Sequence, residues 1–304
     1  MMNILLTHTP LLYFVQSLWR DEAFSVLAAQ KPLSFIITKL GFEPPVYYTL
    51  LHFWMKIFGS SEIATRSLSF IGFILATVII IEWGAKLYKN HWLSWFLPLF
   101  FFLNPMLLYY AFEVRTYGWY TFFATAVVYT FATKNWRWFV VAAVLGFYTH
   151  VYLLPFIGVL GLLHLWSTKK WKSLMPFFLI TGLISPWLVK IASEATRLRS
   201  SWYFPVNVQL VISVLGNMFT GYEGTPWYGW KYTPYLSLFV VGCALIALRN
   251  KTGRQHAKLV TIFGVVPLAL IVGISFVKPL FVNRYLIPTT IAEVLIVVAA
   301  LSSV

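Results

Sequence analysis

Acidic residues are scarce in this chain. Only nine of its 304 residues are Asp or Glu, against 23 Lys and Arg, and Asp21 is the single aspartate. Charged residues of both signs make up 11% of the sequence, whereas soluble domains average about 25%. This shortage excludes an ordinary soluble domain, and it leaves few side chains that could do carboxylate chemistry.

Several other features are missing. The one cysteine, Cys243, excludes a disulfide within the chain. The sequence has no Gly-rich phosphate loop followed by Lys and Ser or Thr, and no His-Glu-x-x-His, which argues against a nucleotide-sugar donor and a zinc hydrolase. The net charge of +14 is assigned to lysines and arginines at membrane borders, so no nucleic-acid partner is expected.

Apolar residues dominate what is present. They make up 60% of the chain, and the mean hydropathy is +0.76. Repeated apolar runs of roughly 18 residues match the thickness of a bilayer. The sequence therefore predicts an all-α polytopic membrane protein with about ten transmembrane helices, forming one membrane-embedded domain over 1–304. The predicted spans are 4–18, 63–85, 92–111, 116–133, two short crossings within 138–166, 173–190, 233–248, 259–277 and 286–304.

The loops indicate an orientation. Short loops rich in Lys and Arg all fall on one face, which the positive-inside rule assigns to the cytoplasm. Seven of the nine acids fall on or near the other face, which also carries the two long segments, 19–62 and 191–232. The working surface is therefore expected on the non-cytoplasmic side. Aromatic side chains beside charges in 191–232 fit either a lid over substrate or an interfacial belt.

The segment 19–62 predicts juxtamembrane helices in a long first outer loop. Asp21–Gln30 and Leu33–Leu40 are each long enough for a short helix, with proline and glycine as breakers between them. Pro45–Phe58 is aromatic-rich and only about 14 residues long, which suits a helix lying on the interface better than one crossing it.

Short motifs carry a resemblance to a known family. They are Asp21-Glu22-Ala23-Phe24-Ser25, Glu43-Pro44-Pro45-Val46-Tyr47-Tyr48, Phe58-Gly59-Ser60-Ser61-Glu62 with Arg66, Asn104-Pro105, Glu113-Val114-Arg115-Thr116-Tyr117 and Asn283-Arg284-Tyr285-Leu286-Ile287-Pro288. In this order and spacing the chain resembles the membrane C-type glycosyltransferases of the family 39-like branch, which includes protein O-mannosyltransferases and aminoarabinose transferases.

The resemblance implies a reaction and its partners. The expected enzyme is an inverting glycosyltransferase with a polyprenyl-phosphate-linked sugar donor and a glycan, glycolipid or protein acceptor. The expected location is a prokaryotic plasma membrane, with the active site facing outward and membrane lipid around it. The resemblance identifies neither the sugar nor the acceptor.

Asp21 and Glu22 are the candidate catalytic residues. Inversion requires a base that takes the proton of the acceptor hydroxyl as it attacks the anomeric carbon, and Asp21 is assigned that role. Its structural alternative is a cap on the helix that follows. Glu22 is a second acid or base, a metal ligand, or a first-turn charge favoured by the helix dipole.

Two arginines are candidates for holding the donor phosphate. A guanidinium offers paired donors that match phosphate, so Arg115, and Arg284 with Tyr285, are expected to bind it. The alternative is snorkelling to lipid headgroups. Glu113 is a candidate to orient Arg115, which requires an irregular turn because residues two apart do not face each other on a helix.

Glu43 and His150 complete the candidate substrate-binding set. Glu43 binds the acceptor or a divalent metal, or is an exposed loop acid. The histidines are scattered, so any metal would need oxygen ligands, and no cofactor is firmly implied. His150 is a candidate donor contact, with a satisfied interfacial histidine as its alternative.

Two other functions stay open at this point. One is a transporter or flippase for a lipid or a lipid-linked sugar, a class that places ionisable residues at mid-bilayer; here only Glu293 lies clearly within a span. The other is a non-catalytic subunit that resembles a transferase. Convergence of the carboxylates and arginines on one site would favour the enzyme.

Overall fold

The computed structural model describes residues 11–89, 91–195, 206–221, 227–250 and 253–303, and all regular structure in these ranges is helical. In chain order the elements are α2 Leu12–Val15, α3 Arg20–Ala29, α4 Leu33–Thr38, α5 Pro45–Phe58, α6 Glu62–Tyr88, α7 Leu93–Phe102, α8 Pro105–Ala111, α9 Tyr117–Ala132, α10 Trp136–Phe147, α11 Leu153–Thr168, the 3₁₀ turn η1 Trp171–Leu174, α12 Met175–Ala195, α13 Val208–Thr220, η2 Trp227–Tyr232, α14 Thr233–Arg249, α15 Arg254–Ser275, η3 Asn283–Leu286 and α16 Ile287–Leu301.

The all-helical membrane architecture is confirmed. Among the described residues, five helices are long and apolar enough to cross a bilayer, or six if α7 and α8, which meet at 53°, form one broken span. The other predicted crossings are shorter helices: α9, α10 and α11 have 16, 12 and 16 residues. At 1.5 Å per residue, helices of this length reach at most about 24 Å. Of the expected span 4–18, residues 4–10 lie outside the described residues, and the described part, 11–18, contains only the four-residue helix α2.

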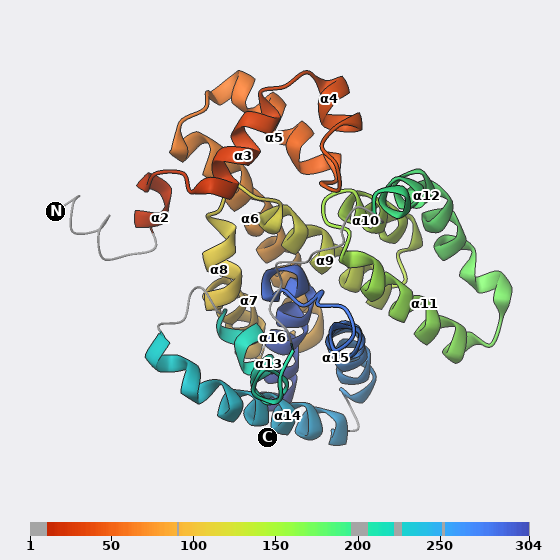
Figure 1. Cartoon of the computed structure of the whole chain (residues 1–304). Coiled ribbons are helices and arrows are strands. Elements are labelled where there is room, and N and C mark those ends of the chain that lie inside the picture. Colours follow the sequence, from red (N-terminus) through yellow and green to blue (C-terminus); the bar gives the residue numbers. More distant parts are fainter. Residues whose placement is uncertain (1–10, 90, 196–205, 222–226, 251–252, 304) are drawn as a thin grey trace.

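The helices pack around α16. The most apolar stretch of α16 is 78% buried inside the protein, whereas the corresponding stretches of the α12 and α14 spans are only 22% and 28% buried. Figure 1 shows α16 enclosed by α7, α13, α14 and α15. Apolar faces left uncovered by protein are the faces that lipid covers, so the chain is a multi-pass integral membrane protein.

The three helices predicted within 19–62 are present as α3, α4 and α5, with ends within two residues of those expected. Pro45 occupies the first turn of α5, where its missing N–H costs nothing. Gly59 ends this helix with φ +81°, a conformation that favours glycine. The three helices share a small core of their own, completed by Leu68 and Val114, and they lie to one side of the bundle (Figure 1).

The segment 191–232, which was expected to contain no transmembrane span, contains no complete candidate span among its described residues but does contain a shorter helix. This is α13, an apolar helix of 13 residues. Asn207 caps its start by accepting from the Leu210 N–H. Its other end is held by Asn104 Nδ2, which donates to the Phe219 carbonyl at 3.0 Å, and by Thr290, which donates to the Met218 carbonyl at 2.6 Å. These partners are distant in sequence, so the local pattern gave no sign of them.

Glycines bring α6 and α9 into close contact. A Cβ atom added at Gly118 would overlap the Ser69 carbonyl, and one added at Gly72 would lie 2.7 Å from the Trp119 amide nitrogen. Small residues are typical of tight helix crossings in membranes. This crossing positions the turn 112–116, which precedes α9, against the first turns of α6.

Candidate active site

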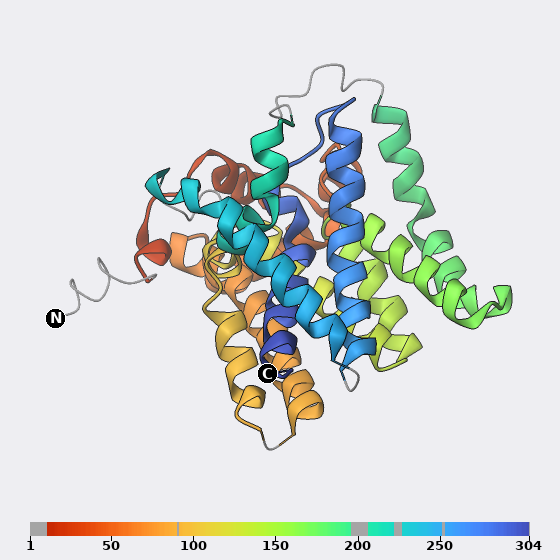
Figure 2. The ribbon, with the colours of Figure 1, turned by 90° about the horizontal axis from the view of Figure 1, so that it is seen from below.

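The structure brings the sequence-predicted residues together at one end of the bundle. We call it the site end; it carries α3–α5, the turns 112–116 and 148–152, and η3. The end of α6, the start of α7 and the C-terminal end of α16 lie together at the opposite end, where Figure 2 shows the C-terminus. The predicted residues at the site end are Asp21, Glu22, Glu43, Glu113, Arg115, His150, Arg284 and Tyr285.

Glu22 is fully engaged within the protein. Its side chain is 3% exposed and forms a fork with Arg66, with Nη2 to Oε2 at 2.6 Å and Nε to Oε1 at 2.9 Å. It also accepts from the backbone N–H of Trp19 at 3.2 Å and of Val114 at 2.9 Å. A carboxylate with four donors in a buried fork has no lone pair turned to a substrate.

Arg66 is the buried partner of Glu22, and no role was predicted for it from the sequence. It lies on the second turn of α6 and also donates to the carbonyls of Phe14, Gln16 and Ser17. One buried guanidinium therefore joins α2 and the segment that follows it, the start of α3, and α6. Its signal in the sequence was a charge inside an apolar helix, which is costly unless paired.

The turn 112–116, which carries Glu113 and Arg115, is irregular, as was expected if the two side chains were to face each other. The Arg115 N–H donates to the Glu113 carbonyl at 2.7 Å. The turn is held by Glu22 through the Val114 N–H, and by Ser69, which donates to the Arg115 carbonyl at 3.2 Å. Backbone anchors on both sides of the Arg115 Cα fix where its side chain starts.

The Arg115 guanidinium is held by Glu43 and Tyr48. Nη2 lies 3.3 Å from Glu43 Oε1, Nη1 donates to the Tyr48 hydroxyl at 3.2 Å, and that hydroxyl donates to Glu43 Oε2 at 2.9 Å. Glu43 therefore takes the orienting role that was predicted for Glu113. Burial and the neighbouring Glu43 charge raise the pKa of Tyr48 well above its ordinary value, so it stays a donor.

Arg115 keeps capacity for a ligand. Its Nε–H is buried and has no hydrogen-bond partner among the described residues. Burial lowers the pKa of Arg115, but the negative charges of Glu43 and Asp21 favour the charged guanidinium, and the pKa is raised overall. A charged guanidinium with a spare donor suits a phosphate oxygen.

Asp21 and Arg284 face each other more loosely. Arg284 Nη2 lies 3.7 Å from Asp21 Oδ2, and the Asp21 side chain is 24% exposed. Arg20, which is 91% exposed, lies 3.6 Å from the other oxygen. The Arg284 guanidinium lies 5.9 Å from the Trp19 ring centroid and 6.0 Å from that of Tyr117. Asp21 is thus accessible and held near a cation without the close fork that occupies Glu22.

His150 is buried among tyrosines. Its ring stacks on Tyr120 at 4.4 Å and lies 4.9 Å from Tyr285. Burial, followed by the charges of Arg115 and Arg284, lowers the pKa of His150 to about 3. The ring is neutral at physiological pH, and its Nδ1 has no hydrogen-bond partner among the described residues.

Tyrosine hydroxyls position η3. Tyr120 donates to the Tyr285 carbonyl at 3.0 Å, and Tyr152 donates to the Leu280 carbonyl at 2.8 Å. The arginine of η3 is therefore placed by α9 and by the turn 148–152, and these tyrosines were not among the predicted residues. Their signal was weak because aromatics are common throughout the chain.

The candidate metal role of Glu43 finds little support. The described residues contain no group of three or more His, Cys, Asp or Glu side chains arranged to hold a metal ion. The carboxylate of Glu43 is already shared between Tyr48 and Arg115.

Comparisons with known proteins find matches among solved structures. No protein-family model matches the sequence, and no curated protein matches it significantly. The crystal structure of ArnT from Cupriavidus metallidurans in the apo state matches with a TM-score of 0.65 and 11% identity over 99% of this chain. The structure of the same protein bound to undecaprenyl phosphate matches with a TM-score of 0.67 and 13% identity over the whole chain.

This chain shares its fold with ArnT. It spans about three fifths of the ArnT chain, 59% and 60% in the two structures. The expected all-helical membrane architecture is thereby found in a solved structure. At 11–13% identity the match shows the fold alone and does not select a branch of the family.

Proposed function

We propose that this protein is an inverting glycosyltransferase that moves a sugar from a polyprenyl-phosphate donor to an acceptor hydroxyl on the non-cytoplasmic side of the membrane. The observation that carries the proposal is the placement of the accessible Asp21 carboxylate beside Arg284, with Arg115 close enough for the Asp21 charge to act on it. The fold shared with ArnT, a protein solved with undecaprenyl phosphate bound, supports a lipid-phosphate donor.

The reaction assigns a role to each group. Asp21 takes the proton from the acceptor hydroxyl as its oxygen attacks the anomeric carbon. The bond between this carbon and the phosphate oxygen breaks, and its electron pair stays on the phosphate. Arg115 and Arg284 stabilise the negative charge that develops there, because preorganised donors act strongly at a buried site. Glu22 positions the Arg115 turn and does not exchange protons.

The donor also needs a place for its isoprenoid tail. A groove of about 680 Å³ runs between α6, α9 and α10. Its lining includes Trp119 and Phe123 of α9 and Leu145 of α10, and Trp119 follows Arg115 by four residues in the sequence. A groove with a mainly apolar lining suits the tail of such a lipid.

The test supplies purified protein with undecaprenyl-phosphate-linked sugars and measures release of undecaprenyl phosphate. Release by wild type and its loss in Asp21→Asn are expected. Movement of intact donor between vesicle leaflets without cleavage would instead identify a flippase. Donor binding without cleavage for every sugar and acceptor supplied would identify a non-catalytic subunit. Mass spectrometry of surface glycans and glycolipids from cells lacking the protein identifies the acceptor.

A further inference from the structure

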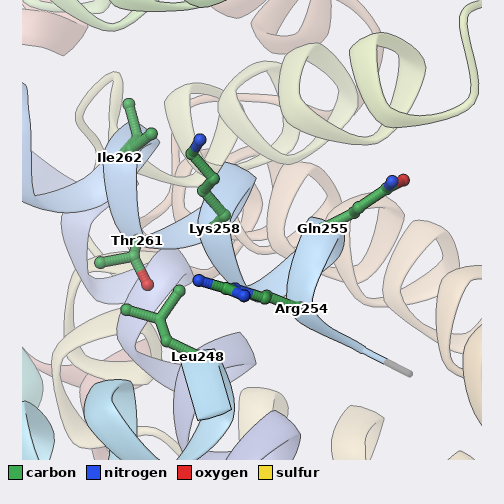
Figure 3. Close-up of a pocket in the computed structure, with 6 residues that line it drawn as sticks. All are labelled: Leu248, Arg254, Gln255, Lys258, Thr261 and Ile262. Atoms are coloured by element: carbon green, nitrogen blue, oxygen red, sulfur yellow. The ribbon is translucent and has the colours of Figure 1, made fainter. Parts of the chain in front are cut away.

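A cavity lies at the end of the bundle opposite the site end, between the end of α14 and the start of α15 (Figure 3). Its volume is about 440 Å³. None of its lining residues belongs to the candidate active site. They are Leu248, Arg254, Gln255, Lys258, Thr261 and Ile262.

Two cations on α15 line this cavity. Arg254 and Lys258 are four residues apart, so they lie on one face of the helix, where like charges repel. Both are exposed, and neither takes part in an ion pair with the acidic side chains that the structure describes. An anion between them would relieve this repulsion.

Thr261 continues the same face of α15, one turn after Lys258. Its hydroxyl oxygen is buried and has no hydrogen-bond partner within the described ranges. Figure 3 shows this hydroxyl and the Arg254 guanidinium directed toward each other, whereas Lys258 extends away from them in this view, on the side of Ile262. A ligand oxygen placed there would satisfy a group that is otherwise costly to bury.

The remaining lining is apolar and lies at a membrane border. Leu248 is at the end of α14, and Ile262 is on α15, a candidate span with a mean hydropathy of 2.3. The cations therefore occupy the first two turns of a crossing helix, at the level of lipid headgroups. Free phosphate would gain nothing from Leu248 and Ile262, whereas a lipid would use both halves of the cavity.

We propose that this cavity binds an anionic phospholipid of the surrounding bilayer. Arg254 and Lys258 contact its phosphate, the Thr261 hydroxyl bonds to an oxygen of the headgroup or glycerol, and an acyl chain lies against Leu248 and Ile262. This site is separate from the proposed transferase reaction and does not depend on it.

The experiment is native mass spectrometry of the purified protein titrated with phosphatidylglycerol or phosphatidylcholine. Wild type is expected to retain phosphatidylglycerol in preference. R254Q/K258Q is expected to bind it about 10 to 30 times more weakly, since each basic residue near an anionic surface contributes on the order of a factor of five. The matched control is K169Q/K170Q, which removes the same charge from an exposed pair at another turn and should keep wild-type binding.

Two outcomes would overturn the proposal. Equal weakening in both double variants would mean that overall charge attracts the lipid, and displacement of the lipid by millimolar inorganic phosphate would identify a site for a soluble anion. If R254Q/K258Q fails to fold, Thr261→Val decides, because it should weaken phosphatidylglycerol binding about threefold. The control is Thr181→Val, the same substitution at an exposed position of α12. Unchanged binding in Thr261→Val would then refute the site.

Discussion

Two neighbouring regions of the site end each contain a carboxylate paired with a guanidinium, and one pair is buried whereas the other is accessible. In the closed ion-pair region, Glu22 and Arg66 are 3% and 4% exposed and meet at 2.6 Å. In the open ion-pair region, Asp21 and Arg284 are 24% and 12% exposed and meet at 3.7 Å. Both carboxylates belong to the first turn of α3. The difference teaches that a closed pair holds structure, whereas an open pair leaves its charges available to a ligand.

The largest effect is expected from Asp21→Asn. Asparagine keeps the size of the side chain but cannot accept a proton, and general base catalysis contributes about 10²- to 10⁴-fold. We expect transfer to fall by that factor while donor binding persists. Release of polyprenyl phosphate measures transfer, and titration with undecaprenyl phosphate measures donor binding. Full activity in this variant would remove the distinction between the two regions.

Glu22→Gln tests the closed region. Removing one partner of a buried pair leaves Arg66 uncompensated, and such changes cost about 3–5 kcal/mol. The expected result is a large fall in the unfolding temperature in detergent. Glu62→Gln is the control, because Glu62 is exposed on the same helix as Arg66. A stable Glu22→Gln protein that had lost transfer would instead make Glu22 a reacting group.

Arg284→Lys keeps the charge of the open region but removes the planar fork. Lysine cannot bind phosphate through two parallel donors, so affinity for undecaprenyl phosphate should fall about tenfold, a loss of about 1.4 kcal/mol. Arg20→Lys changes a residue whose side chain is 91% exposed and should bind normally. Equal affinity in wild type and Arg284→Lys would show that only the charge matters.

Tyr48→Phe tests how the Arg115 guanidinium is held. The hydroxyl bonds to both Glu43 and Arg115, and one lost hydrogen bond to a charged group is worth about 1.5–3 kcal/mol. Transfer should fall about tenfold or more with the fold intact. Tyr235→Phe, on an exposed face of α14, is the matched control. A similar loss of transfer in Tyr235→Phe would mean that the effect of Tyr48→Phe does not come from its bonds to Arg115 and Glu43.

The smallest effect concerns His150 and pH. Its folded-state pKa of about 3 lies below the ordinary value of 6.5, so the unfolded chain binds the proton more readily. Its contribution to stability is complete above pH 6.5 and is lost progressively as pH falls toward 3. His150→Phe should show a flatter loss of stability below pH 6.5 in thermal unfolding. An unchanged slope would mean that the ring is not buried as a neutral group.

Local sequence signals account for the predicted helices of the site end. Proline and glycine breakers and short apolar runs delimit α3, α4 and α5, and each of these signals acts within a few residues. The pair α7–α8, expected as one span over 92–111, is bent by 53° near Asn104, which caps α8 and also bonds to Phe219, 115 residues away. The sequence did not predict this contact.

In the candidate site, too, some features were predicted from the sequence and others were not. The scarcity of acids in an apolar chain drew attention to Asp21 and Glu43, whereas Arg115 was selected because a guanidinium matches phosphate. Their partners were not predictable, because the pairs Glu22–Arg66 and Glu43–Arg115 are 44 and 72 residues apart. Periodicity carries no information about such contacts.

The sequence by itself determined that this is a helical membrane protein with its few acids gathered toward one face, because hydrophobicity and charge act through composition and local order. Only the tertiary structure decided which of two adjacent carboxylates is closed and which is open. One residue further along a helix turns a side chain by about 100°. That rotation directs Glu22 into the packed joint with α6 and leaves Asp21 accessible beside Arg284.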